Sequence, residues 1–203
     1  PVPAIDRSLL FKAPDLTEGA TLARHLARAP LSLAAVELLA PGDGESGEGA
    51  SSPLVAVRIL ESVDGVDEAE RVVSERAGMP PFQQLQGEKS AAIFANVRAM
   101  EDGAELVVRL SLLPSRLPEL VEMTSRLSGL YEPTAGWGMR MAAHAHTGVL
   151  RVMIAKVRRS DAGMGFRLIG PLLRMIGVAD TGRLCSVYGV VNLGGQKLMT
   201  STG

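Results

Sequence analysis

The chain has 203 residues, a formal net charge of −1, 46% hydrophobic residues and 21% charged residues. These values are typical of an ordinary globular domain, and the near-neutral charge does not indicate nucleic acid or an anionic membrane as an electrostatic partner. No apolar run reaches the ~18 residues that span a bilayer, and the first residues do not form a signal peptide. We therefore expect a cytoplasmic protein without a membrane span.

In the first half of the chain, strand-like segments alternate with one-sided helices. These elements are strands at 8–12, 35–39 and 54–60, and helices from Asp15 to Pro30, from about Asp64 to Gly78 and over 88–100. Asp15 is a plausible N-cap with Glu18 three residues later, and Gly78 is a natural C-terminal stop. The stretch 41–53 is rich in glycine, serine and acidic residues, which is typical of a solvated loop.

The second half follows a similar order. Its predicted elements are strands at 105–112, 137–146, 149–157 and 184–191, and helices over about 115–127 and 166–176. Short strands mixed with one-sided helices predict an α+β fold: a mostly antiparallel sheet with helices on one face, in two ferredoxin-like halves. We divide the chain accordingly into residues 1–103 and 104–203.

The segment with the clearest chemical potential runs from Trp137 to Val152 and predicts a hairpin with a tight turn at Thr147-Gly148. Side chains alternate along a strand, so Arg140, His144 and His146 should share one face, with Arg151 on the return strand. Arginine can bind a carboxylate through a fork of donors, and histidine can move a proton near neutral pH.

The same hairpin allows two further interpretations. Its polar face could be an ordinary solvated sheet face, and a His-x-His pair can also bind a metal ion. A metal is disfavoured, because no Asp, Glu or Cys lies nearby in sequence to complete the ligand set. We recognise no Walker loop, no Gly-x-Ser-x-Gly elbow, no zinc-type spacing and no fingerprint of a dinucleotide-binding βαβ unit.

Three segments resemble the C-terminal cap domain of FAD-linked oxidases, most closely the FAD-binding small subunit of bacterial glycolate oxidase. They are residues 22–39, residues 88–100, and the stretch Ala-Ala-His-Ala-His-Thr-Gly-Val-Leu-Arg-Val that begins at Ala142. The resemblance covers about residues 1 to 160. Related subunits carry Gly-Asp-Gly or Gly-Asn-Gly in this hairpin, where the present chain has His-Thr-Gly, so the resemblance does not imply metal binding here.

The resemblance implies a cap that covers the substrate in an FAD-dependent 2-hydroxy acid (glycolate-type) oxidoreductase. FAD would be bound mainly by an upstream domain absent from this chain, and further subunits of a glycolate oxidase-like complex would be partners. His144 or His146 would accept the hydroxyl proton, and Arg140 or Arg151 would hold the substrate carboxylate. The chain alone is not expected to catalyse, because the flavin carries the redox chemistry.

Two alternatives belong to other functional classes. The chain could be a non-enzymatic ferredoxin-like module for ligand binding or assembly, because a fold does not determine a function. It could also be a small-molecule lyase or isomerase that uses the histidine pair. That last activity would need a carboxylate partner, and the sequence shows none converging on the pair.

Overall fold

The computed structural model describes residues 5–40, 52–102, 104, 106–130, 138–155, 186–193 and 196–202. The strands in this part of the chain are β1 (Ile5–Lys12), β2 (Leu33–Ala40), β3 (Leu54–Glu61), β4 (Gln83–Gln86), β5 (Leu106–Ser111), β6 (Gly138–His144), β7 (Val149–Ala155), β8 (Ser186–Leu193) and β9 (Gln196–Thr202). The helices are α1 (Leu16–Ala27), α2 (Val63–Ala77), α3 (Glu88–Asp102) and α4 (Leu117–Leu130), with a short 3₁₀ turn at Pro114–Arg116.

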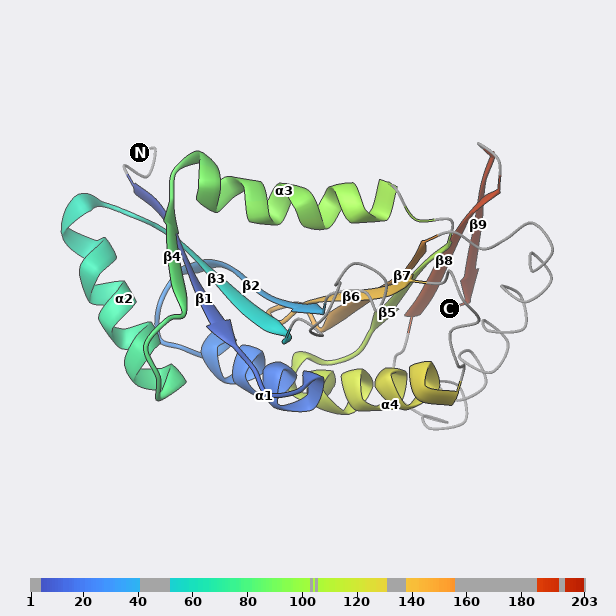
Figure 1. The fold of residues 1–203 in the computed structure, drawn as a ribbon, viewed down its shortest axis with the longest axis horizontal. Helices are drawn as coiled ribbons and strands as arrows, with labels where there is room; N and C mark the ends of the chain where they lie inside the picture. Colours follow the sequence, from blue (N-terminus) through green and yellow to red (C-terminus); the bar gives the residue numbers. More distant parts are fainter. Residues whose placement is uncertain are drawn as a thin grey trace.

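The described strands form a single antiparallel sheet of nine strands in the order β4-β1-β3-β2-β6-β7-β5-β8-β9. Every neighbouring pair in this order is antiparallel. The sheet runs the length of the molecule, with β4 at one edge and β9 at the other (Figure 1).

Two ferredoxin-like units of four strands each form this sheet, and β9 extends it beyond β8. In the first unit the elements follow as β1, α1, β2, β3, α2 and β4, and the strands lie side by side as β4-β1-β3-β2. In the second unit β5 is followed by α4, β6 and β7, and the strands lie as β6-β7-β5-β8. The units join where β2 pairs with β6. The α+β class, the antiparallel sheet and the two halves expected from the sequence are confirmed.

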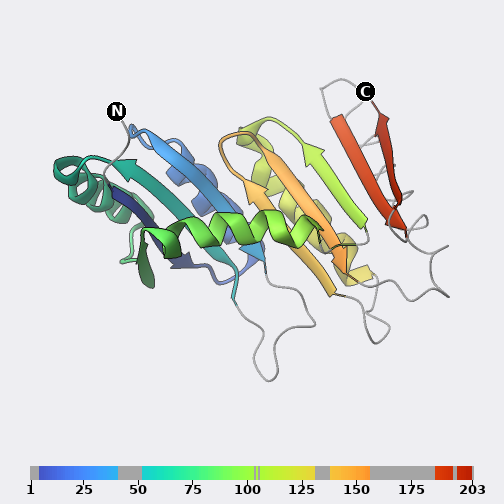
Figure 2. The same ribbon diagram turned by 90° about the horizontal axis from the view of Figure 1, so that it is seen from above.

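The two faces of the sheet are covered unequally. The main hydrophobic core contains residues of α1, α2 and α4 against one face of the sheet. α3 instead crosses the opposite face, over strands of both halves (Figure 2). The expectation that helices lie on one face therefore holds for α1, α2 and α4 and not for α3, which links the two units and packs on the other face.

The core is built mainly from aliphatic side chains, as the scarcity of aromatic residues requires. Phe11 is the bulkiest fully buried side chain, and Leu, Ile, Val, Met and Ala fill most of the remaining space. Burial of each large aliphatic side chain contributes about 1.5–3 kcal/mol. A smaller cluster beneath α3 contains Val97, Ala104, Val107, Ala142 and Met153.

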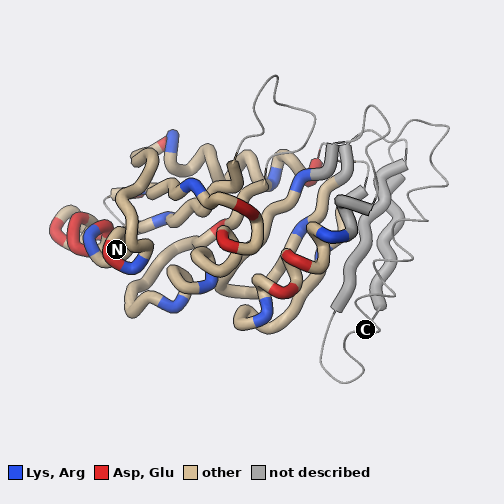
Figure 3. Tube along the Cα trace, turned by 60° about the horizontal axis from the view of Figure 1, so that its bottom comes forward, with Lys and Arg blue, Asp and Glu red and all other residues tan. Residues whose placement is uncertain are grey.

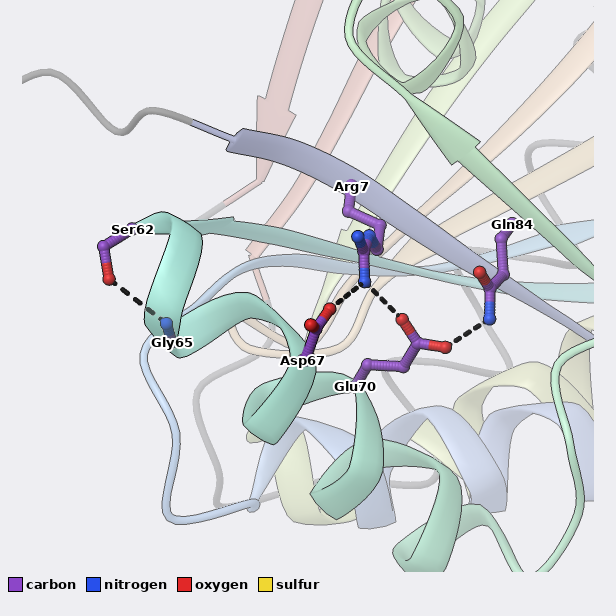
Figure 4. Close-up of polar contacts among 6 residues, drawn as sticks. All are labelled: Arg7, Ser62, Gly65, Asp67, Glu70 and Gln84. Carbon is purple, nitrogen blue, oxygen red and sulfur yellow. Dashed lines mark hydrogen bonds and ion pairs between the residues drawn. The ribbon is translucent and has the colours of Figure 1, made fainter.

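The helix ends follow local sequence rules. Asp15 caps α1 by accepting a hydrogen bond from the backbone N–H of Glu18 at 2.7 Å, as predicted. α2 begins one residue before the expected Asp64, because Ser62 is its N-cap and accepts from the N–H of Gly65 at 3.2 Å (Figure 4). Gly78 ends α2 with a φ of 67°, a left-handed conformation that favours glycine.

Charged side chains fasten α2 to the edge of the sheet. Arg7 on β1 donates to Asp67 at 2.8 Å and to Glu70 at 2.6 Å, and Glu70 also accepts from Gln84 on β4 (Figure 4). Charges of both signs lie close together on α2, near the N-terminus of the chain (Figure 3). In the described part of the chain, no helix is long and apolar enough to cross a membrane.

Two strands were not predicted. β4 reads Gln-Gln-Leu-Gln and is largely exposed, so it lacks the apolar alternation that marks a strand. β9, from Gln196 to Thr202, is the opposite edge strand and is also rich in polar residues. The predicted helix at 166–176 and the acidic loop at 41–51 lie outside the described residues.

Candidate functional site

The hairpin between β6 and β7 closes at Gly148, as the Thr147-Gly148 pair predicted. Gly148 has a φ of 67° and donates its N–H to the carbonyl of His144 at 3.0 Å. A Cβ at this position would lie 2.1 Å from the carbonyl oxygen of Leu112. Only glycine fits both the backbone conformation and the space, so the turn holds the nearby histidines in a defined place.

The two histidines lie beside one another at this turn. Their ring centroids are 5.7 Å apart with an interplanar angle of 51°. The strand ends at His144, so His146 belongs to the turn and not to the strand, in contrast to the predicted alternation up to residue 146. Thr147 Oγ1 lies 3.1 Å from His144 Nδ1, which orients that ring.

The surroundings of both imidazole rings lower their pKa values and so favour the neutral form. Burial lowers the pKa of His144 below 6.5, and the neighbouring His146 and Arg151 lower it further. Burial alone lowers the pKa of His146. Both rings are only partly buried, so each can meet a ligand as a proton acceptor near neutral pH.

Arg140 and His144 project from the α3 side of the sheet. Met141, Ala143 and Ala145 belong to the main core on the other side, whereas Ala142 packs in the small cluster beneath α3. Side chains alternate along a strand, so the predicted common face of Arg140 and His144 is confirmed for β6, and Met141 and Ala143 between them face the core. The register partner of Ala142 is Arg151 on β7, which lies on the same side.

Arg151 stands between two carboxylates. Its Nε lies 3.0 Å from Glu101 Oε1 on α3, and its Nη1 lies 3.7 Å from Glu37 Oε1 on β2. Glu101 also forms an ion pair with Arg109 on β5. We refer to Glu37, Glu101, Arg109 and Arg151 as the Glu37 cluster. It joins α3 to three strands near the junction of the two units.

Glu37 is a residue that the sequence pattern did not single out. Only 5% of its surface is exposed, and Oε2 has no hydrogen-bond partner in the structure. Burial raises the pKa of Glu37 to about 7, against the opposing attraction of Arg151. A carboxyl group with this pKa exchanges a proton near neutral pH, which is a property found often at functional sites.

The sequence did contain a signal for Glu37. It stands in the run Ala-Ala-Val-Glu-Leu-Leu, in which all residues except the glutamate are apolar. A charged residue within such a strand must either face solvent or find a partner. β2 pairs with β6, and the register partner of Glu37 is His144. This non-local pairing places a carboxyl group beside the histidine pair, and the sequence alone could not show it.

Other candidate sites have less support. Among the described residues, no three His, Cys, Asp or Glu side chains come together as a metal site would require. The letters Gly-x-Gly-x-x-Gly do occur at 42–47, outside the described residues. The next element in the described part of the chain is β3, an antiparallel neighbour of β2, whereas a dinucleotide-binding unit continues with a helix and a parallel strand.

No protein-family model and no curated protein matches this sequence. Solved structures do match its fold. FgChi7B shares 12% identity and a TM-score of 0.55, over 89% of this chain and 45% of that one. A variant of berberine bridge enzyme shares 13% identity and a TM-score of 0.51, over 91% of this chain and 43% of that one. The berberine bridge enzyme from Eschscholzia californica gives 11% identity and a TM-score of 0.50.

These neighbours define the class of fold. The chain shares the fold of part of FgChi7B and of part of berberine bridge enzyme. At such low identities the likeness concerns the fold alone. The chain spans less than half the length of each of these structures, so it corresponds to one part of them.

Proposed function

We propose that this chain is the substrate-covering cap domain of an FAD-dependent 2-hydroxy acid oxidoreductase of the glycolate type, with halves at about residues 1–103 and 104–203. The observation that carries the proposal is the fold shared with berberine bridge enzyme over 91% of this chain but only 43% of that structure. The partners would be an upstream FAD-binding domain and further subunits of a glycolate oxidase-like complex.

The face that would meet the substrate is the α3 side of the second unit. Three of the four candidate residues, Arg140, His144 and Arg151, lie on this side of β6 and β7, and His146 lies next to His144 in the turn. Grouping a proton acceptor and guanidinium groups on one sheet face suits a ligand that carries a hydroxyl beside a carboxylate.

His144 or His146 would accept the hydroxyl proton. Burial lowers the pKa of each ring, so each is mostly neutral near pH 7 and can act as a base. For His144 to accept at Nε2, its Nδ1 must carry the other proton and donate it to Thr147 Oγ1, 3.1 Å away. Thr147 is therefore a positioning residue in this proposal.

Arg140 or Arg151 would hold the substrate carboxylate. Arg140 lies on the same face as His144, four residues back along β6 and partly buried. Arg151 is nearer to the junction of the units and already pairs with Glu101 and Glu37. A substrate carboxylate at Arg151 would have to displace or neutralise one of these carboxylates.

FAD, when bound, would supply the acceptor for the hydride that leaves the α-carbon. The described part of the chain has no glycine-rich turn that opens a helix, which is the usual site for a pyrophosphate. The chemistry of the donor set, two imidazoles and two guanidinium groups, instead suits the substrate. We therefore assign FAD mainly to the upstream domain, and the substrate side of the pocket to this chain.

The test begins with the purified chain and FAD, followed by flavin fluorescence. The chain alone should not bind FAD stoichiometrically. A complex of this chain with its FAD-binding domain should lose flavin absorbance when glycolate is added without oxygen. Of the variants His144→Gln and His146→Gln in that complex, the one that removes the proton acceptor should slow this reduction by about 10²–10⁴-fold.

His25→Gln is the matched control, because His25 lies on α1, on the other side of the sheet, and is exposed. It should leave the rate of flavin reduction unchanged. Stoichiometric FAD binding by this chain alone would contradict the proposed division of labour. A complex that binds FAD but is not reduced by any 2-hydroxy acid would contradict the proposed substrate class. It would favour the interpretation as a non-enzymatic module.

A further inference from the structure

The Glu37 cluster contains one more carboxylate than Arg151 can satisfy. Arg151 is closest to Glu101, at 3.0 Å, whereas Glu37 approaches it only to 3.7 Å, which is too far for a hydrogen bond. The second oxygen of Glu37 is buried without any partner. A buried ionised carboxylate in this state is costly, and taking up a proton removes the cost.

Glu37 is also enclosed on most sides. Its register partner on β3 is Ala56, and its register partner on β6 is His144. The charged groups around it are Arg151 on β7 and Glu101 on α3, with Arg109 on β5 beyond Glu101 and Arg140 further along β6. The pKa of Glu37 is raised to about 7 by burial, and Glu101 adds to the effect.

Within the pair of Arg151 and Glu37, Arg151 is the residue whose side chain can reach a ligand. About 22% of its side chain is exposed, compared with 6% for Glu37. When Glu37 is ionised, the charges of Glu37 and Glu101 balance those of Arg109 and Arg151. When Glu37 is protonated, Arg151 keeps Glu101 as its close partner and regains attraction for a further anion.

We propose that Arg151 and Glu37 form a binding site for a small carboxylate in which the ligand replaces Glu37 as the second counter-ion of Arg151, and Glu37 takes up a proton as the ligand binds. The inference rests on the proposed function, because it names the group that receives the substrate carboxylate. It adds a residue, Glu37, and a coupling of substrate binding to proton uptake.

The test uses the full chain and glycolate as the probe, with calorimetry between about pH 7 and pH 9 in buffers of different ionisation enthalpy. Glycolate should bind about tenfold more weakly for each pH unit above 7, and about one proton should enter the protein per glycolate bound at the upper end of the range. The histidines stay neutral throughout this range, because their pKa values lie below 6.5.

Glu37→Gln is the decisive variant, because glutamine imitates the protonated side chain. It should bind glycolate with little dependence on pH, and more tightly than the unaltered chain at pH 9. Glu75→Gln removes an exposed carboxylate on α2 and should behave like the unaltered chain. Arg151→Lys keeps the charge but loses the fork, and should bind glycolate several-fold more weakly.

Three results would overturn the inference: no glycolate binding at pH 7, the same pH dependence in the Glu37→Gln variant, or unchanged affinity in the Arg151→Lys variant. The proposed function fails separately. If the chain binds glycolate with proton uptake but glycolate never reduces the flavin of the complex, the proposed carboxylate site stands. The proposed oxidoreductase function is then wrong.

Discussion

Two polar clusters lie beneath the two ends of α3, and they are satisfied to different degrees. The first, here called the Asp6 cluster, consists of Asp6, Ser8, Arg58 and Ser90. Arg58 donates to both oxygens of Asp6, at 3.1 and 2.6 Å, and Ser90 donates to Asp6 at 2.5 Å. Ser8 and Ser90 are 2.6 Å apart, so Ser8 donates to Ser90 in turn.

The Glu37 cluster, at the other end of α3, is left incomplete. Hydrogen bonds from Arg58 lower the pKa of Asp6, whereas burial raises the pKa of Glu37 to about 7. A carboxylate that accepts well-formed hydrogen bonds holds a helix in place. A carboxylate buried with an unpaired oxygen costs stability, and such groups are retained mostly where they have a function. We therefore assign a structural role to the Asp6 cluster and a functional role to the Glu37 cluster.

The largest expected effect on stability comes from substituting the glycine of the turn beside the histidines, compared with the glycine at a helix end in the first unit. Gly148 and Gly78 share a φ of 67°, but a Cβ would strike the Leu112 carbonyl only at Gly148. Gly148→Ala should lower the free energy of unfolding by about 3 kcal/mol or more, and Gly78→Ala by about 1 kcal/mol. Urea unfolding checks both, and equal losses would contradict the role of close packing at the turn.

Removing the charge of Asp6 should break the satisfied cluster. Asp6→Asn leaves Arg58 without its counter-ion and should lower the free energy of unfolding by about 2 kcal/mol at pH 7. The folded pKa of Asp6 is below 3.8, so this stabilisation is present above pH 4 and is lost as the pH falls through the folded value. Urea titrations at several pH values measure it, and a neutral substitution would contradict the structural assignment.

Glu37→Gln should act in the opposite direction. The folded pKa of Glu37 is raised from 4.5 to about 7, so the folded state binds the proton more tightly. Its favourable contribution is therefore complete below pH 4.5 and is lost as the pH rises through 7. At pH 8 the variant should be about 2–3 kcal/mol more stable than the unaltered chain, because each unit of pKa difference corresponds to about 1.4 kcal/mol. A variant that is less stable than the unaltered chain at pH 8 would show that the ionised Glu37 carboxylate has favourable partners in the folded state.

The smallest expected effect concerns the histidines. The pKa values of His144 and His146 lie below 6.5, so the folded state resists their protonation. Their contribution is present above pH 6.5 and is lost as the pH falls through their folded values. His144→Gln should change stability at pH 7 by less than about 1 kcal/mol. Proton NMR of the ring resonances measures both pKa values, and a value above 6.5 for either would contradict the burial argument.

Much of the fold could be predicted from local patterns. The Asp15 cap, the Gly78 stop and the Thr147-Gly148 turn depend on neighbouring residues alone, and the structure confirms all three. β4 was missed because Gln83–Gln86 is an exposed edge strand held mainly by its pairing with β1. Its residues carry no apolar pattern, so only tertiary structure could reveal it.

The site was harder to predict than the fold. The sequence brought His144, His146 and Arg151 together because they share one hairpin. Glu37 reaches the same place only through the pairing of β2 with β6, and Glu101 only because α3 crosses the face of the sheet opposite the other helices. Both are contacts between residues far apart in sequence, which no pattern within one segment contains.

The hydrogen bonds of the Asp6 carboxylate beneath one end of α3 are complete, whereas Glu37 beneath the other end holds an exchangeable proton. The most direct measurement is a carbon-13 NMR titration of the side-chain carboxyl groups in the full chain, with Asp6→Asn and Glu37→Gln used to assign the two signals. We expect Asp6 to titrate below its ordinary pKa of 3.8 and Glu37 to titrate near 7. A Glu37 signal that titrates near 4.5 would contradict this expectation.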